Sequence, residues 1–299
     1  MKLDTLVLAG ASTKVPAYIG ILKALYEQRI LNENLDGIQH IITCSIGMLS
    51  ALYMLLGVNL NVQEETVLRC NFLDIIDIEN VDVHDLLFNL GLFDNVKVAS
   101  FIKGVLTEKY SKEDMTLQEL YELRPIKLTV KCVNASKSCN AYINHETDPD
   151  LSILTLLRMT TAIPMFFKPV EYKGNLYVDG GLTGGYPVEL VKDNYLGFNI
   201  RCKHNFVDKD SPIHLVPIIP YYMSLSSIKW ADYDELPKDK TIHVHTDVHF
   251  SNFDVSLDKK RELIQLGYEA TIQHIKQYNL TNDNLSNEHP ADINPTEKD

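Results

Sequence analysis

Positive charge is scarce in this 299-residue chain, which has 28 lysines and arginines against 40 aspartates and glutamates and a formal net charge of −12. Proteins that bind nucleic acid need clustered lysine and arginine against the phosphates, so a nucleic-acid partner is disfavoured. The same deficit disfavours electrostatic attachment to an anionic membrane. Hydrophobic residues make up 45% and charged residues 23%, which is the balance of an ordinary globular protein.

Cysteine is also sparse. The five cysteines are an odd number and form no Cys-x-x-Cys pair, the spacing typical of redox and zinc motifs. We therefore expect free thiols in a reducing compartment. The first four residues contain an acid and no apolar segment, so we expect no secretory signal and a cytoplasmic location, with peripheral contact at membranes.

One uncharged apolar stretch, residues 41–58, reaches the lower limit of a membrane span. Its two parts have different patterns, however. Residues 38–42 are typical of a buried strand and residues 46–56 of a buried helix, with small residues between them. A strand, a sharp turn and a helix explain this stretch better than a span.

The beginning of the chain predicts an α/β protein. Residues 3–8 form an apolar run that predicts a buried strand, and Pro16 fits the first turn of a helix over 17–28. The strand and helix at 38–56 follow. This alternation predicts a parallel sheet with helices on both faces.

The remaining pattern is consistent with one domain, residues 1–278, followed by a polar tail, 279–299, that we expect to be disordered. Residues 61–89 are helical only in places. Thr116 to Glu119 reads as a capping box that opens a short helix. We predict further helices at 96–108, 151–161 and 257–278, and strands at 126–133, 139–143, 176–178, 213–219 and 240–245.

The first candidate for chemistry is Ser45, between the strand and helix of 38–56. A serine in such a turn is lifted out of the sheet and exposed to substrate, and the helix N-terminus favours developing negative charge. Gly47 satisfies the second glycine of Gly-x-Ser-x-Gly, while Thr43 stands in place of the first. Taken alone, the residues also fit a serine that caps an ordinary helix.

Two further segments add to this pattern. Asp179-Gly180-Gly181 follows a strand, so flexible residues let a carboxylate reach into a site, although a generic Asp-Gly turn looks the same. Residues 9–14 lie between the first strand and helix. Their backbone N–H groups could stabilise an oxyanion, or form a plain connecting loop.

Together and in this order, these three segments resemble the patatin-like phospholipase family. That family carries a glycine-rich anion loop, then Gly-x-Ser-x-Gly, then Asp-Gly-Gly or Asp-Gly-Ala. The resemblance covers nearly the whole chain short of the tail. Other matching segments are 18–22, 91–94, 161–167, 176–181 and 253–270.

The resemblance implies a three-layer α/β/α fold with a mainly parallel sheet, and lipid acyl hydrolysis in lipid metabolism or degradation. The substrate would be a phospholipid or another acyl ester, met in transient contact with a membrane surface. Ser45 would give its proton to Asp179 and attack the ester carbonyl. Water activated by the same aspartate would then hydrolyse the acyl-enzyme. Serine and aspartate would thus do the work of a Ser-His-Asp triad without the histidine.

The resemblance also assigns the supporting residues. Gly10, Ala11 and Ser12 would supply oxyanion N–H donors, and Lys14 keeps the basic position of the loop. The turn that carries Ser45 would depend on Gly47, and the loop that follows Asp179 would depend on Gly180 and Gly181. Neither a metal nor another cofactor is implied.

The chain departs from the family pattern at several positions. Ala11, Ser12 and Val15 replace loop glycines, and an added Cβ disfavours backbone angles that glycine adopts easily. Loss of one oxyanion donor costs about 2.7–4 kcal/mol. Gly185 and Tyr186 stand where the family usually has an Asn pair, which predicts a looser aspartate loop.

Two other features each have a functional and a purely structural interpretation. His243, His245 and His249 are close in sequence, but no carboxylate or cysteine has a convincing metal-ligand spacing, so solvated or hydrogen-bonded histidines are favoured. The apolar segment 217–227 could touch lipid through its tyrosines, but a buried turn and helix is favoured.

Three functions stay open at this stage. The leading one is a lipid acyl hydrolase. The second is a transacylase, in which an alcohol resolves the acyl-enzyme. The third is a lipid-binding protein of the same fold whose altered loop weakens catalysis. Ser45 and Asp179, both present, favour an enzyme over a binding protein.

Overall fold

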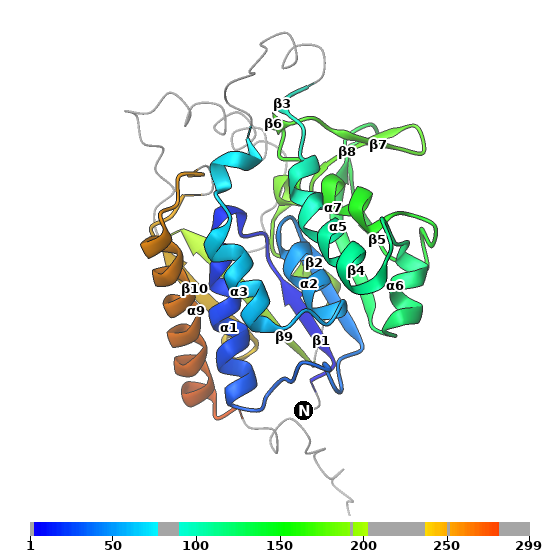
Figure 1. Cartoon of the computed structure of the whole chain (residues 1–299). Coiled ribbons are helices and arrows are strands. Elements are labelled where there is room, and N and C mark those ends of the chain that lie inside the picture. Colours follow the sequence, from blue (N-terminus) through cyan, green and yellow to red (C-terminus); the bar gives the residue numbers. More distant parts are fainter. Residues whose placement is uncertain (1–2, 77–89, 192–193, 203–236, 250–251, 281–299) are drawn as a thin grey trace, which may run out of the picture.

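The computed structural model describes residues 3–76, 90–191, 194–202, 237–249 and 252–280 (Figure 1). Within these residues the main sheet has eight strands, in the order β10-β9-β1-β2-β4-β8-β7, with β5 paired to β4. The strands are β1 (Thr5–Leu8), β2 (His40–Cys44), β4 (Lys127–Asn134), β5 (Cys139–Ile143), β7 (Val170–Tyr172), β8 (Asn175–Asp179), β9 (Tyr195–Cys202) and β10 (Thr241–Thr246).

The sheet is mostly parallel. β10, β9, β1, β2 and β4 run in one direction, while β5 and β8 are antiparallel to β4 and β7 is antiparallel to β8. A small second sheet pairs β3 (Gly91–Phe93) with β6 (Met165–Phe167). The predicted α/β class with a mainly parallel sheet is therefore confirmed.

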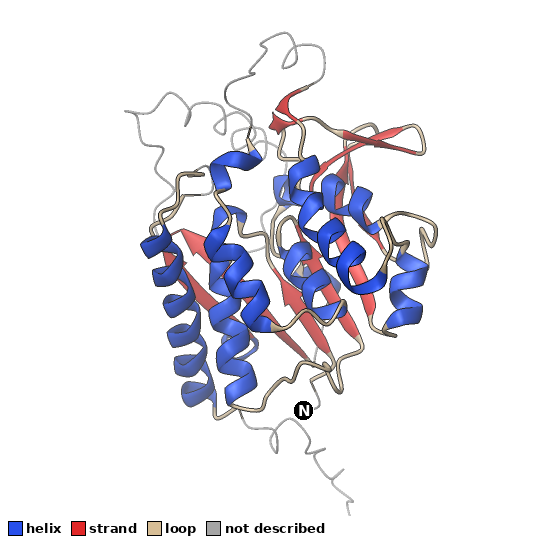
Figure 2. Ribbon diagram, in the orientation of Figure 1, coloured by secondary structure: helices blue, strands red, loops and turns tan. Residues whose placement is uncertain are grey.

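Seven α-helices lie in the described residues, and Figure 2 shows them gathered in front of the strands. Their ends follow local sequence rules. Pro16 opens the first helix, Thr116 and Glu119 form the predicted capping box, and Ser256 caps the last helix. The helices are α1 (Pro16–Glu27), α2 (Gly47–Leu55), α3 (Leu60–Arg69), α5 (Val96–Tyr110), α6 (Leu117–Leu123), α7 (Ile153–Thr160) and α9 (Leu257–Tyr278).

The main core lies between the sheet and these helices. Alternate strand residues such as Leu6, Val130 and Phe198 face the helices and are fully buried. Among the described helices the most extensive contact joins α1 to α9, where glycines allow the backbones to touch. A Cβ at Gly20 would lie 1.8 Å from the carbonyl oxygen of Ile264, and one at Gly267 would lie 2.1 Å from that of Ala17.

The opposite face of the sheet is covered, among the described residues, by the segment 180–191, which we call the strap. It contains two short 3-10 helices, η4 (Gly180–Thr183) and η5 (Val188–Leu190). Tyr186 and Val188 pack against Val7 of β1 and Tyr195 of β9. The strap thus starts at the end of β8 and crosses beneath the parallel strands.

The apolar stretch 41–58 forms β2, a turn and α2, as predicted. None of the described helices is both long and apolar enough to cross a bilayer. The predicted hairpin of β4 and β5 is also present. The five cysteines all lie in the described part of the chain, and none of them forms a disulfide there.

β9 was not predicted from the sequence, although it lies in the middle of the sheet. The signal was present, because Leu196, Phe198 and Ile200 alternate with Gly197, Asn199 and Arg201. The short strands β3, β6 and β7 were not predicted either. The predicted strand at 213–219 and the apolar segment 217–227 lie outside the described residues, as does 281–299, so the division into a domain and a tail stays a prediction.

Replacement of Gly267 by alanine is expected to destabilise the protein, because the added Cβ meets backbone atoms of α1 that no rotamer change can move. Overpacking of this kind costs about 1–3 kcal/mol of unfolding free energy. Chemical denaturation measures it. The matched control is Gly104→Ala on α5, where nothing lies within 4 Å of the new Cβ and a gain of about 0.5–1 kcal/mol is expected. Equal effects in the two variants would contradict the α1–α9 contact.

Candidate active site

Ser45 occupies a strained turn between β2 and α2. Its φ is +53°, a left-handed conformation that costs a non-glycine residue roughly 1–2 kcal/mol. The Ser45 N–H donates to Oγ1 of Thr160 at 2.8 Å, and that hydroxyl donates to the carbonyl of Lys131 at 2.8 Å. Neighbouring elements therefore hold the turn in place. Strain maintained in this way is typical of functional sites, and this turn has the strand-to-helix geometry of a nucleophile elbow.

Gly47 is required because α2 begins against the end of β1. A Cβ atom at this position would lie 2.6 Å from the carbonyl oxygen of Ala9 and 2.7 Å from Oγ1 of Thr43. The Thr43 hydroxyl is buried and finds no hydrogen-bond partner within the described residues. Thr43 thus fills the elbow where the usual motif has glycine, and the close approach of helix and strand depends on Gly47 alone.

Asp179 ends β8 and faces Ser45. Its Oδ2 accepts a hydrogen bond from Ser45 Oγ at 2.6 Å, and its Oδ1 accepts one from the Gly181 N–H at 2.6 Å. Gly180 lets the chain turn close to β4, because a Cβ there would lie 2.5 Å from the carbonyl oxygen of Lys131 and 2.9 Å from Cys44 Sγ. Both predicted glycines therefore have a structural task at this carboxylate.

The pairing of β4 explains why two residues 134 positions apart meet. β5 occupies one edge of β4 over residues 130–134, so β2 and β8 must share the other edge. β2 runs along β4 until Cys44 pairs with Lys131. β8 comes from the opposite direction until Asp179 pairs with Cys132. The two strands meet end to end, which brings the residue after β2 against the last residue of β8.

Burial sets the electrostatics of the site, since Ser45 is 7% and Asp179 4% exposed. Burial raises the pKa of Asp179 to about 6, while hydrogen bonds from Ser45, Gly181 and Cys44 act against this rise. At neutral pH the carboxylate is ionised and still basic enough to accept a proton. Burial also raises the pKa of Cys44, so its thiol stays protonated beside the aspartate.

The loop after β1 lies next to Ser45. A Cβ at Gly10 would lie 3.2 Å from Ser45 Cβ, which leaves little room for any other residue. The Gly10 N–H donates to the carbonyl of Gly185 at 2.7 Å, and the Tyr18 hydroxyl donates to the carbonyl of Ala9. The peptide between Ala9 and Gly10 is therefore fixed at both ends, and its N–H already has an acceptor.

Replacement of the loop glycines produces less distortion than the sequence suggests. Ala11 has φ −124°, which any residue adopts, and only Ser12 is left-handed, with φ +50°. Lys14 is buried in the following turn, and burial lowers its pKa to about 8. The structure thus places Gly10 and Ser12 beside the serine, with Ala11 between them in the loop.

The strap is held in place at Tyr186, although Gly185 and Tyr186 predicted a looser loop after Asp179. Tyr186 is 2% exposed, and its hydroxyl lies 2.8 Å from Thr241 Oγ1. Gly197 of β9 leaves the space for it, because a Cβ there would lie 1.6 Å from the Tyr186 hydroxyl oxygen. A buried tyrosine therefore anchors the chain after Asp179.

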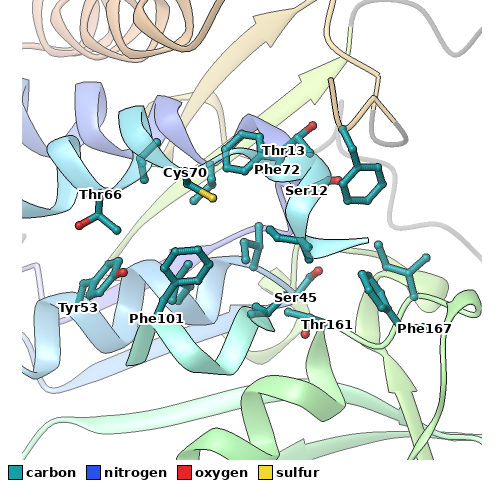
Figure 3. Close-up of a pocket in the computed structure, with 18 residues that line it drawn as sticks. Ser12, Thr13, Ser45, Tyr53, Thr66, Cys70, Phe72, Phe101, Thr161 and Phe167 are labelled. Carbon is teal, nitrogen blue, oxygen red and sulfur yellow. The ribbon is translucent and has the colours of Figure 1, made fainter. Parts of the chain in front are cut away.

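An apolar pocket opens beside Ser45 (Figure 3) and encloses about 680 Å³, part of which is open to solvent. Figure 3 shows Tyr53 and Thr66 towards one end of it and Ser12 and Phe167 towards the other. It was not predicted from the sequence, because its lining comes from segments far apart in the chain. The lining residues are Ser12, Thr13, Val15, Ser45, Ile46, Leu49, Tyr53, Thr66, Val67, Cys70, Phe72, Ile75, Val98, Phe101, Thr161, Ile163, Phe167 and Phe253.

The histidines of the segment 243–249 do not line this pocket. His243 and His245 share one face of β10, with ring centroids 6.2 Å apart. No group of three or more histidine, cysteine, aspartate or glutamate side chains in the described ranges is arranged to hold a metal ion.

Two supporting residues were missed from the sequence, Thr160 and Lys131. Thr160 gave no distinct signal. Lys131 did, because a lysine between buried Val130 and Cys132 breaks an apolar strand and needs a partner.

Comparison with known proteins agrees with this architecture. Residues 6–192 match the family model described as patatin-like phospholipase. The chain is 25% identical over 187 residues to the probable lipid hydrolase 463L of Invertebrate iridescent virus 6, which covers 62% of each protein. It is 22% identical over 287 residues to the uncharacterized protein R571 of Acanthamoeba polyphaga mimivirus, which covers 92% of this chain and 94% of that one.

Two solved structures share the fold. VipD from Legionella pneumophila matches with a TM-score of 0.64 at 17% identity, over 93% of this chain and 67% of VipD. The type III effector ExoU of Pseudomonas aeruginosa matches with a TM-score of 0.55 at 13% identity, over 94% of this chain and 54% of that one. The chain thus spans about half the length of ExoU. Its match to 463L covers 62% of that viral protein.

Asp179→Asn is expected to stabilise the protein above pH 6, because the buried carboxylate is costly once it is ionised. The folded pKa of Asp179, about 6, lies above its ordinary value of 3.8, so the folded state binds the proton more tightly and stability falls as pH rises between these values. At about 1.4 kcal/mol per pKa unit, the gain at pH 8 is at most about 3 kcal/mol. Thermal unfolding at several pH values measures it. A gain that persists below pH 4, or a loss at pH 8, would contradict the burial effect.

Proposed function

This chain belongs to the patatin-like phospholipase family, and we propose that it hydrolyses lipid acyl esters with Ser45 as nucleophile and Asp179 as base. Family membership implies a lipid acyl hydrolase acting on lipid esters. The observation that carries the assignment of residues is the 2.6 Å hydrogen bond from Ser45 Oγ to Asp179 Oδ2 in a buried site.

In the first half of the proposed reaction, Ser45 Oγ forms a bond to the acyl carbon while its proton passes to Asp179 Oδ2. The carbonyl π electrons move onto the oxygen. When the oxyanion collapses, the bond to the alcohol breaks and the leaving alcohol takes the proton from Asp179. This leaves the acyl group on Ser45.

In the second half, Asp179 accepts a proton from water as the water oxygen attacks the acyl carbon. The second oxyanion collapses, the bond to Ser45 Oγ breaks, and the serine recovers the proton from Asp179. The products are a free fatty acid and an unchanged enzyme. One carboxylate serves both halves because its pKa of about 6 lies close to neutral pH, where a general acid–base group works best.

The proposed oxyanion site is the loop after β1. Since the Gly10 N–H donates to Gly185, the stabilising donors are assigned to the N–H groups of Ala11 and Ser12, with Gly10 keeping the loop close to Ser45. Ser12 lines the pocket together with Ser45. Preorganised backbone donors of this kind supply a large part of catalysis in acyl transfer.

The apolar pocket supports a lipid as substrate. Leu49 and Tyr53 follow Ser45 at intervals of four residues on one face of α2. At 1.5 Å per residue they extend roughly 12 Å from the nucleophile. A pocket of this shape and character accommodates an acyl chain with its ester at Ser45.

Labelling with a fluorophosphonate probe tests the proposal, because the probe bonds to activated serines. We expect the native protein to label, and Ser45→Ala and Asp179→Asn to label at least about 100-fold more slowly, as for loss of a nucleophile or its base. Ser50→Ala, which removes a buried serine within α2, is the matched control and should label normally. A folded native chain that stays unlabelled even with lipid micelles would contradict the hydrolase and favour lipid binding.

The labelling rate is also expected to depend on pH. It should rise as Asp179 loses its proton and level off above an inflection at about 6, the raised pKa of this buried group. Rates measured between about pH 4 and pH 8 give the profile. An inflection near the ordinary aspartate value, or none, would show that a buried Asp179 is not the base.

A further inference from the structure

Lys131 is a buried lysine in the middle of the sheet. It is 2% exposed and lies between Val130 and Cys132, which face the main core. Its side chain therefore points to the opposite face, towards the strap. Burial of an ammonium group is expensive unless its donors are paired, so the position of this lysine calls for a physical reason.

All three acceptors of the ammonium group lie on the strap. Nζ donates to the carbonyl oxygens of Thr183 at 3.2 Å and Gly184 at 3.0 Å, and to Oε1 of Glu189 at 2.7 Å. Glu189 also accepts a hydrogen bond from the Tyr142 hydroxyl at 2.7 Å. An ammonium group has three protons to donate, and here each of them is directed at the segment that follows Asp179.

The strap needs such a clamp because of its composition. Residues 180–185 read Gly-Gly-Leu-Thr-Gly-Gly, with four glycines in six positions. Glycine has the largest backbone freedom of any residue, so this segment cannot easily hold a fixed conformation by itself. Asp179 is attached directly to it.

The backbone of Lys131 acts on the other half of the site. Its carbonyl accepts the hydrogen bond from Thr160, which in turn accepts the Ser45 N–H. Lys131 also pairs with Cys44, the residue before the serine. The same residue thus fixes the serine through its main chain and the aspartate loop through its side chain.

We propose that Lys131 is a positioning residue that holds Asp179 against Ser45 by clamping the glycine-rich strap to β4. The inference rests on the proposed function of the two residues. Lys131 does not line the apolar pocket. Its loss should therefore slow the chemical step and leave ligand binding unchanged.

Saturable fluorophosphonate labelling separates these two quantities, because it gives a chemical rate, kinact, and a binding constant, KI. For Lys131→Met we expect kinact to fall about 10- to 100-fold, the effect of a small misplacement of a reacting group, with KI unchanged. Lys131→Arg, which keeps donors for the two carbonyls, should recover most of the rate. A kinact of folded Lys131→Met within twofold of the native value overturns the proposal.

Lys127→Met is the matched control. Lys127 lies on the same strand and face, four residues earlier, and pairs with Glu146 near the surface. We expect its kinact to stay native, and an equal loss in both variants overturns the proposal. Should Lys131→Met fail to fold, Glu189→Gln replaces it. That change removes the charge that anchors the ammonium group and should lower kinact at least threefold, and an unchanged value overturns the proposal.

Hydrogen exchange of the strap keeps the inference separate from the proposed function. If the native protein does not label, the hydrolase assignment fails, but the clamp still predicts faster amide exchange over residues 180–190 in Lys131→Met than in Lys127→Met. Equal exchange in the two variants overturns the clamp whether or not the protein labels.

Discussion

Two strands share one edge of β4, and the site lies where they meet. β2 ends beside Lys131 and β8 ends beside Cys132, so Ser45 and Asp179 face each other across a gap set by neighbouring residues of a third strand. The sheet provides this precision at little cost, because the same pairing satisfies backbone hydrogen bonds that must be made anyway. A shift of either strand along β4 would separate the serine from the aspartate.

The residues around this junction cost folding free energy. A strained serine, a buried aspartate with a raised pKa and a buried lysine lie within one small region. Each costs folding free energy, and each is tolerated because a neighbour fixes it: Thr160 holds Ser45, Gly181 donates to Asp179, and Lys131 finds acceptors on the strap. The cost at Asp179 and Lys131 comes from the removal of charged groups from water, whereas the cost at Ser45 comes from its left-handed backbone.

Glycine placement shows which parts of the motif are geometric necessities. Gly10, Gly47 and Gly180 all lie where a Cβ would press on a neighbouring strand or on Ser45. At Ala11 the backbone angles suit any residue, and at Ser12 the left-handed conformation costs about 1–2 kcal/mol, as it does at Ser45. The loop could therefore lose glycines that the family usually has and still lie beside the serine, which the sequence pattern alone could not establish.

The sequence by itself determined the α/β class and the positions of most helices and strands, because periodicity and caps are local signals. Ser45 and Asp179 became candidates only through the order of three segments and the family resemblance that this order carries, since each residue alone also fits an ordinary helix cap or turn. The alternating pattern of β9 is an equally local signal, but the strand was not predicted from it. Only the tertiary structure decided that β2 and β8 meet on β4, that Tyr186 anchors the strap, and that segments from residue 12 to residue 253 line one pocket. These depend on contacts between distant parts of the chain. Pairing energy and burial select such contacts, and no short stretch of residues records them.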